Sequence, residues 1–408
     1  MTDTDPRAHD VASAVADALT TIDRTLERFG DDQFPCDCTV DDRYPKRKGD
    51  WPTDDTVLGS NVGWTSSFWT GQLWLALELT GAERYAVAAG AQVATFTDRL
   101  ARDIELNHHD LGFLYTLGCV AGRHSHPDAA VASEAEETAL AAADLLMHRR
   151  YLESAGVIQA WGSMSDPTQA GRVIIDSLLN LPLLFWASGA PGRAHYAERA
   201  HRHALALRDT IIRDDDSTFH TFYFDTTTGE PLRGMTAQGA SDSSTWARGQ
   251  AWGIYGFALA HAFTGDATLL DASERCARYF LAHLPADKVA FWDLDFTDGS
   301  SEERDSSAAA IAVCGLLQLA GALGQRGDAY RDAASEILGS LIVHYATGGA
   351  DDTDALLRHG VYAKPQGIGI DAGCIWGDYY YLEALMRVTR PDWVPYWTLR
   401  YTDERRFV

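Results

Sequence analysis

Six helical segments of the sequence are apolar on nearly all sides, and this feature constrains the fold most. Each combines aromatic residues, glycine and small apolar residues with one or two polar residues near its start. Such helices have to be buried rather than placed at the surface. Most of them end at a glycine, which is a helix C-terminal signal, as at Gly81, Gly189 and Gly265. The segments are Ser67–Thr80, Asp110–Ala121, Ile174–Ser188, Thr245–Thr264, Asp305–Leu323 and Ile375–Val388.

Amphipathic segments alternate with the apolar ones, and their period of about 3.6 residues predicts outer, half-exposed helices. They span roughly residues 8–29, 83–104, 131–149, 192–213, 267–284 and 327–346. Six outer–inner pairs predict an all-α fold, the (α/α)6 barrel or six-hairpin toroid, formed by residues 1–408 as a single domain. An open helical solenoid is the alternative, but it would expose the last inner helix. A β-hairpin is expected at Thr218–Asp225, where residues alternate before a TTTGEP turn.

The chain is strongly acidic. Its 408 residues include 34 Lys and Arg against 58 Asp and Glu, which gives a net charge of −24. Such a charge repels phosphate backbones and anionic membranes, so neither a nucleic acid nor a membrane is expected as a partner. Few of the basic residues are lysines. A salt-rich cytoplasm and a GC-rich genome explain this bias equally well.

The sequence predicts a cytoplasmic protein. The acidic start MTDTDPRAHD is followed by no apolar signal-peptide core, and no run approaches the ~18 apolar residues that span a bilayer. Four of the six cysteines lie singly in helical stretches, where a buried thiol is the default. Cys36 and Cys38 are too close for a standard zinc pair. We therefore expect a reduced chain without a metal or another cofactor.

Polar and aromatic residues gather at the predicted inner-helix starts and in the loops before them, which converge on one mouth of a toroid. Aromatic rings stack on the apolar face of a sugar, arginine binds carboxylates, and Asp or Glu transfers protons. This combination suits a sugar acid as ligand. The candidate residues are Trp64, His108, His109, Asp110, Trp161, Asp176, His220, Gln238, Arg248 and Trp252.

Asp176 and Asp110 are the candidates for proton transfer, and each has a structural alternative. Asp176 lies in VIIDSLLNLPLLFW, whose apolar residues would raise its pKa, and the alternative is a buried carboxylate satisfied locally. Asp110 follows His108 and His109, and the alternative is a helix N-cap. No HxxxH or HxxE pattern accompanies the two histidines, so a metal site is not expected.

Arg248 lies in an otherwise apolar helix, where an unpaired charge is costly. It must meet either an acid of the protein, such as Asp242 or Asp305, or an acidic ligand, and the sequence favours neither. Asp305 and Asp378 stand near helix starts, so we expect them to cap or support helices.

Several long motifs follow one another between Trp64 and about Arg387, and HHDLGF and WARGQAWG are the most specific. They are GWTSSFWTGQLW (63–74), HHDLGF (108–113), IIDSLLNLPLLFWA (174–187), QGASDSSTWARGQAWGIYGFA (238–258), RDSSAAAIA (304–312) and IWGDYYYLEAL (375–385). In order and spacing they resemble the unsaturated glucuronyl hydrolases, glycoside hydrolase family 88. The resemblance implies an (α/α)6-barrel catalytic domain.

The same resemblance implies a glycosidase that releases Δ4,5-unsaturated glucuronic acid from the non-reducing end of oligosaccharides made by polysaccharide lyases. It implies that Asp176 is the general acid and base and that Asp110 is the second essential carboxylate. Arg248 and His220 are the expected counter-charges for the anionic substrate. The implied substrate-binding residues are Trp64, His109, Trp161, His220, Gln238, Arg248 and Trp252.

The implied reaction hydrates a double bond. Protonated Asp176 would donate to C4 while water adds at C5, and the carboxylate would then act as the base for that water. The hemiketal opens and expels the remaining sugar. Alternatives are an unsaturated rhamnogalacturonyl hydrolase and a non-catalytic carbohydrate-binding toroid, but the HHDLGF motif and the presence of both aspartates favour the glucuronyl enzyme. The sequence leaves open whether the chain forms a homodimer.

Overall fold

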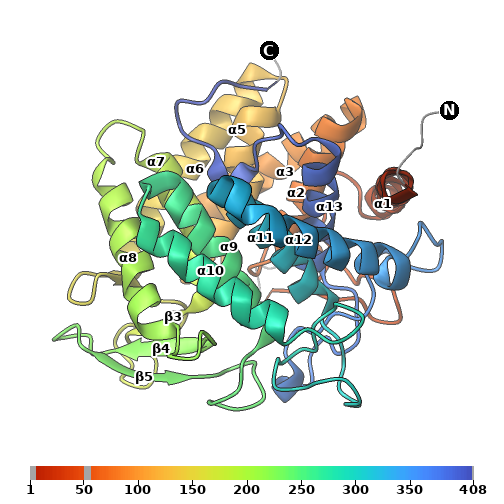
Figure 1. The fold of residues 1–408 in the computed structure, drawn as a ribbon. Coiled ribbons are helices and arrows are strands. Elements are labelled where there is room, and N and C mark those ends of the chain that lie inside the picture. The colour runs from red at the N-terminus through yellow and green to blue at the C-terminus, as the bar shows by residue number, and fades with distance from the viewer. Residues whose placement is uncertain (1–5, 50–56, 407–408) are drawn as a thin grey trace.

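The computed structural model describes residues 6–49 and 57–406, which fold as a ring of paired helices (Figure 1). The inner helices are α2 (Ser66–Thr80), α4 (Leu111–Tyr115) continued to α5 (Ala121–Ser125), α7 (Leu181–Ala187), α9 (Ala247–Thr264), α11 (Ser306–Leu323) and α13 (Ile375–Thr389). The outer helices are α1 (Pro6–Phe29), α3 (Glu83–Ala101), α6 (Ala129–Arg150), α8 (His195–Ile211), α10 (Ala267–Ala282) and α12 (Asp328–Ser340). The predicted all-α, (α/α)6-barrel architecture is confirmed.

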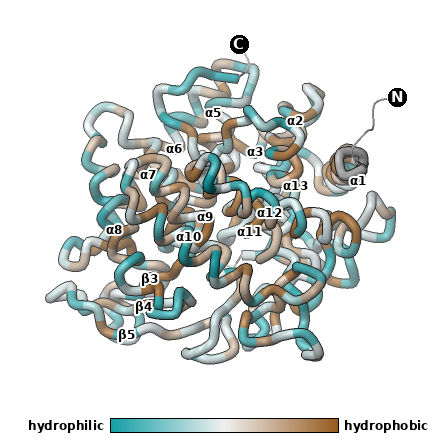
Figure 2. The backbone as a smooth tube through the Cα atoms, viewed as in Figure 1, coloured by the Kyte–Doolittle hydropathy of each residue, from teal (hydrophilic) through white to brown (hydrophobic). Residues whose placement is uncertain are grey.

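The inner and outer helices differ in how much of their surface is buried, as the sequence pattern predicts. In α9 every residue from Ala247 to Ala260 is buried, whereas α3 and α10 bury one face each. Figure 2 shows hydrophobic residues concentrated toward the interior and hydrophilic ones mainly on the outer helices and loops. The N-terminal helix α1 packs against α13, so it gives the last inner helix its outer partner and closes the ring (Figure 1).

Two of the predicted glycine stops have the expected conformation. Gly81 after α2 and Gly265 after α9 both have φ of 70°, a left-handed conformation that glycine adopts without steric cost. At Gly189 the predicted stop is confirmed in position: α7 ends at Ala187, one residue before the predicted end at Ser188, but Gly189 does not adopt a positive φ.

The third inner helix begins as a tight 3-10 turn, Ile175–Asn180, before α7. Pro182 stands in the first turn of α7, where its missing N–H leaves no hydrogen bond unmade. Asp176 is therefore the second residue of the tight turn and not an interior residue of a regular α-helix. This position lies at the mouth of the ring rather than along its wall.

A small sheet lies at one edge of the ring, beside α8 (Figure 1). Strands β4 (Thr221–Phe224) and β5 (Pro231–Met235) form the predicted hairpin. The sequence pattern missed β3 (Arg172–Ile174), which pairs antiparallel with β4. A second pair, β1 (Tyr151–Leu152) with β2 (Val157–Ile158), follows α6.

One helical stretch, Ser306–Tyr345, is long and apolar enough by composition to cross a membrane, contrary to the expectation that no run comes close. In this fold 72% of its most apolar window is buried. Its first part is α11, which packs against α9, α12 and α13. A core helix of a barrel meets the same compositional test, because it too is apolar on every side.

Candidate active site

A cavity of about 270 Å³ lies at the mouth of the ring. Nine of the ten candidate residues named from the sequence line it, and His220 does not. The residues come from the ends of different elements: the loop before α4, the 3-10 turn before α7, and the first turns of α9. The lining consists of Trp64, His108, His109, Asp110, Trp161, Asp176, Gln238, Trp246, Arg248, Trp252 and Tyr362.

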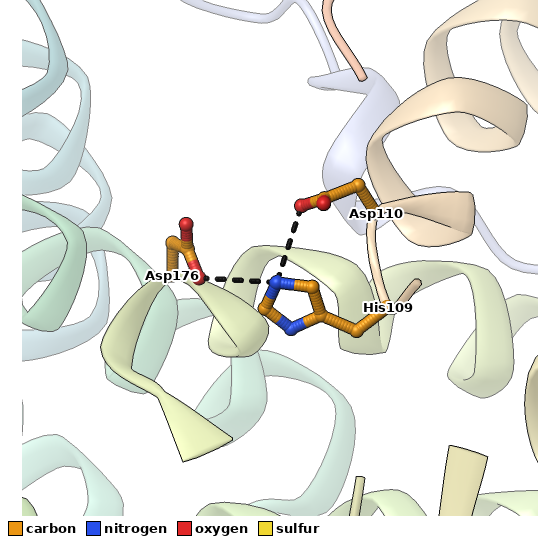
Figure 3. Close-up of side chains that lie close together, drawn as sticks. All are labelled: His109, Asp110 and Asp176. Carbon is orange, nitrogen blue, oxygen red and sulfur yellow. Dashed lines mark ion pairs between the residues drawn. The ribbon is translucent and has the colours of Figure 1, made fainter. Parts of the chain in front are cut away.

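His109 stands between the two carboxylates (Figure 3). Its Nε2 lies 3.3 Å from Asp110 Oδ1 and 3.6 Å from Asp176 Oδ1. Within the described part of the chain, Oδ1 of Asp176 is buried and has no hydrogen-bond partner. A buried acceptor or donor without a partner is costly, so this atom is placed for a ligand rather than for the fold.

The surroundings shift the pKa values of the two carboxyls in opposite directions. Burial raises the pKa of Asp176 well above its usual range, and the nearby charge of Asp110 raises it further. Burial also works to raise the pKa of Asp110, but the neighbouring His109 and the side-chain contact to His108 outweigh it and hold that pKa below its usual value. Burial lowers the pKa of His109 to about 4. At neutral pH the site therefore holds a protonated Asp176, an ionised Asp110 and a neutral His109.

Asp110 occupies the N-cap position of α4, but its side chain makes no capping hydrogen bond. Instead its Oδ2 lies 3.2 Å from Nδ1 of His108, whose Nε2 donates to the carbonyl of Glu105 at 2.8 Å. Gly112 is required by close packing here, because a Cβ would lie 2.2 Å from the Cα of Asn180. The HHDLGF motif thus brings Asp110 and the turn of Asp176 together.

Arg248 meets a protein acid. Its Nη1 donates to Oδ2 of Asp305 at 2.9 Å, and both side chains are almost fully buried. Its Nη2 donates to Oε1 of Gln238 and to the carbonyl of Tyr362, each at 2.7 Å. Asp305 also caps α11, as expected, by accepting from the N–H of Ser307. The pair with Asp305 offsets much of the Arg248 charge, although Arg248 also lines the cavity, so its role as counter-charge for the substrate stays a prediction.

His220 lies beside the cavity and supports the loop that carries Gln238. Its Nδ1 accepts from the N–H groups of Ala237 at 2.9 Å and Gln238 at 3.1 Å, so its proton is on Nε2. Its ring packs 4.4 Å from that of Trp246. Burial lowers the pKa of His220 to about 3, so it is neutral and is not the expected counter-charge.

Two lining residues, Trp246 and Tyr362, were not among the candidates. Trp246 stands two residues before Arg248 in the motif STWARGQAW, so this motif could have identified it as a candidate. Tyr362 lies in an irregular loop, and its hydroxyl accepts from Nε1 of Trp64 at 2.8 Å. Nothing in the local sequence marks Tyr362, because only the closed ring brings this loop to Trp64.

His109, Asp110 and Asp176 also form a group that could hold a metal ion, with ligand atoms within 4.8 Å of one another. A protonated Asp176 is a poor ligand, since metals bind the carboxylate. The raised pKa of Asp176 therefore fits proton transfer better than metal binding.

The chain matches the model of Glycosyl Hydrolase Family 88 over residues 39–388. It is 45% identical to the unsaturated glucuronyl hydrolase of Bacillus sp. (strain GL1), over 92% of this chain and 96% of that one. The crystal structure of that Bacillus protein superimposes with a TM-score of 0.86, covering 95% of this chain and 98% of that one, at 44% identity.

Two streptococcal proteins are similar over the same length. The unsaturated chondroitin disaccharide hydrolase of Streptococcus pyogenes serotype M1 is 44% identical over 95% of this chain and 93% of its own. An aspartate-to-asparagine mutant of the Streptococcus agalactiae unsaturated glucuronyl hydrolase, solved with dGlcA-GalNAc6S, has a TM-score of 0.80 at 40% identity and covers 95% of this chain and 93% of that one. The fold, the motifs and these matches agree, and the chain belongs to Glycosyl Hydrolase Family 88.

Proposed function

We propose that this protein is an unsaturated glucuronyl hydrolase that hydrates the C4=C5 double bond of a Δ4,5-unsaturated uronic acid at the non-reducing end of an oligosaccharide. The observation that carries the proposal is the pair of carboxyls in one cavity, of which Asp176 is protonated and Asp110 ionised. Carboxyls whose surroundings push their pKa values apart are the pattern of an acid and its partner. Relatives named for such activity support the substrate class.

In the proposed reaction Asp176 donates its proton to C4 of the enol ether, and positive charge develops at C5 and the ring oxygen. Water adds at C5 and gives its proton to the Asp176 carboxylate, which restores the acid. The C5 hemiketal then opens by breaking its bond to the ring oxygen. The hemiacetal at C1 expels the rest of the chain, which leaves a 4-deoxy-5-keto uronic acid.

The other residues bind and orient the sugar in this proposal. Asp110 stabilises the positive charge that develops near C5, and neutral His109 is close enough to both carboxyls to hold them in place. Gln238 is positioned by Arg248 and by the backbone contact to His220. Trp64, Trp161 and Trp252 offer ring faces to the pyranose.

We further propose that residues 1–408 form one catalytic domain that acts in the cytoplasm on these oligosaccharides, without a nucleic acid or membrane partner. The six cysteines are all unpaired, which is typical of a reducing compartment. The net charge of −24 disfavours contact with phosphate backbones and anionic lipids.

The proposal is tested with a panel of lyase-generated disaccharides, by following the loss of the ultraviolet absorbance of the conjugated uronate. We expect turnover of unsaturated glucuronyl disaccharides, with or without EDTA. Activity only on unsaturated rhamnogalacturonan fragments would identify the related hydrolase instead. Binding without turnover would identify a carbohydrate-binding toroid, and loss of activity in EDTA that a divalent ion restores would show a metal enzyme.

The pH dependence of kcat/KM is expected to be bell-shaped. As pH rises through the lowered pKa of Asp110, the rate increases, because the ionised form is required. As pH rises further through the raised pKa of Asp176, the rate falls, because the proton to be donated is lost. The apparent values belong to the coupled pair. A rate that keeps rising into the alkaline range would contradict the assignment of Asp176 as the acid.

A further inference from the structure

Of the two residues expected to supply positive charge for an anionic substrate, one is paired with an acid and the other is neutral. Arg248 is paired with Asp305, and His220 is neutral. In a chain of net charge −24, an acidic oligosaccharide would be repelled unless positive charge lies close to the cavity. Two other arginines, Arg150 and Arg172, lie there.

Arg150 is a buried cation that forms no ion pair with a carboxylate within residues 6–49 and 57–406. It is 1% exposed, at the end of α6, and every acceptor of its hydrogen bonds is neutral. These acceptors are the carbonyls of Gln159, Ala160 and Gly162 and the side-chain oxygen of Asn107. Burial, followed by the charge of Arg172, lowers the pKa of Arg150 to about 10, so it stays protonated at neutral pH.

Arg172 stands at the start of β3, and its guanidinium covers the ring of Trp161 at 4.1 Å. Its Nη2 donates to the carbonyl of Trp161 at 3.2 Å, and its Nε is buried without a hydrogen-bond partner among the described residues. In that same part of the chain neither Arg172 nor Arg150 forms an ion pair with a carboxylate. Two like charges held together without a counter-ion are destabilising, and an anion between or beside them offsets that cost.

Both arginines line a second cavity of about 1600 Å³ that shares Trp161 with the catalytic cavity. This cavity is lined by four arginines against two carboxylates, Asp103 and Glu105. Arg149 pairs with Asp103 at 2.6 Å and Arg102 pairs with Asp98 at 3.2 Å, which leaves the two positive charges of Arg150 and Arg172 against one lining carboxylate, Glu105.

Beside Tyr362, another lining residue of the catalytic cavity, the described residues offer no such surplus. Lys364 lies there, but Glu302 and Glu303 both pair with its ammonium. A negatively charged chain is therefore attracted toward Trp161 and repelled from the side of Lys364.

We propose that Arg172, backed by the charge of Arg150, forms an anion subsite past Trp161 that binds an acidic group on the sugars following the unsaturated residue. The acidic group is a uronate carboxylate or a sulfate ester, since a guanidinium binds either through two parallel hydrogen bonds. Trp161 forms the common wall, so one chain occupies both cavities. This subsite rests on the proposed function, because it takes the remainder of the same substrate.

The test compares kcat/KM for three unsaturated tetrasaccharides, whose sugars after the first are neutral, carry a uronate, or carry a sulfate ester. We expect Arg172→Gln to lower the values for the acidic substrates about tenfold more than the value for the neutral one, as for loss of one charge-assisted contact. The difference in kcat/KM between the uronate and the sulfate tetrasaccharide shows which anion the subsite binds. Arg172→Lys keeps the charge and is expected to retain part of the preference.

A second variant acts in the opposite direction without touching Arg172. Asp103→Asn frees Arg149 and is expected to increase the preference for acidic substrates; asparagine tolerates the φ of 54° at this position. Arg331→Gln on the exposed face of α12 is the matched control and leaves the preference unchanged.

Equal losses on neutral and acidic tetrasaccharides in Arg172→Gln would overturn the subsite, because Arg172 would then only support Trp161. Wild-type turnover of disaccharide with no preference for acidic remainders would overturn it too, while the proposed function stands. Absence of turnover on every unsaturated substrate would overturn both.

Discussion

Asp176→Asn is expected to reduce turnover of an unsaturated disaccharide by at least about a thousandfold, since the one residue serves as acid and base. Asparagine has the shape of the protonated acid but no proton to give. The cavity already holds a neutral group at this position, because burial raises the pKa of Asp176. The fold and substrate binding are therefore expected to remain, and the measurement pairs steady-state kinetics with binding of the unreacted disaccharide.

Stability gives the same variant a second readout. Below the ordinary pKa of a carboxyl, Asp176 is protonated in both states and the free energy of unfolding carries no penalty from it. As pH rises toward its raised folded-state pKa, the unfolded chain releases the proton that the folded chain keeps, and the wild type loses stability. Asp176→Asn lacks this loss, so its melting temperature relative to wild type should increase with pH.

The matched control for this experiment is Asp225→Asn. Asp225 lies in the exposed turn between β4 and β5 and accepts from two backbone N–H groups, which asparagine can also do. We expect this control to leave both turnover and stability near the wild-type values. A near-normal rate in Asp176→Asn would remove Asp176 from the chemistry.

Arg248→Met is expected to destabilise the protein by about 3–5 kcal/mol, as for removal of one partner of a buried ion pair. The change leaves Asp305 as a buried carboxylate without its counter-ion and removes the donors to Gln238 and to the carbonyl of Tyr362. Because these contacts hold the cavity wall, kcat/KM should fall as well. Denaturant unfolding measures the stability, and the substrate panel measures the activity.

The double variant Arg248→Met/Asp305→Asn separates the ion pair from the packing. Asparagine at 305 removes the buried charge while keeping the oxygen that caps α11. We expect the double variant to recover part of the stability lost in Arg248→Met. If Arg248→Met unfolds at the wild-type denaturant concentration and only KM rises, then Arg248 acts mainly as a substrate ligand, and its assignment as a buried structural pair fails.

The helix layers could be predicted from the sequence because burial is encoded locally. An inner helix is apolar on all sides, whereas an outer helix is apolar on one side, and this difference is visible in every helical turn. The six inner and six outer segments were therefore predicted to within a few residues of their ends. The hairpin was predicted for the same reason, because its alternating pattern is local. β3 was missed because three residues carry too short a pattern.

The candidate site was predictable where its residues stand in long motifs. Asp110, Asp176 and Arg248 lie at or near inner-helix starts, so the toroid brings them to one mouth. Tyr362 and the partner of Arg248 could not be found in this way, since both depend on which loops meet across the ring. The sequence left open whether Arg248 meets a protein acid, such as Asp242 or Asp305, or an acidic ligand, and only the tertiary structure shows the contact with Asp305.

The sequence by itself determined the all-α ring and the set of chemical groups at its mouth, because side-chain polarity and helical period are properties of each segment. Only the tertiary structure decided the charge of those groups. It buries Asp176 beside Asp110, pairs Arg248 with Asp305 and, within the described residues, leaves Arg150 and Arg172 without an ion pair. The physical reason is that ionisation depends on local solvation and neighbouring charge, which distant segments supply only after the ring has closed.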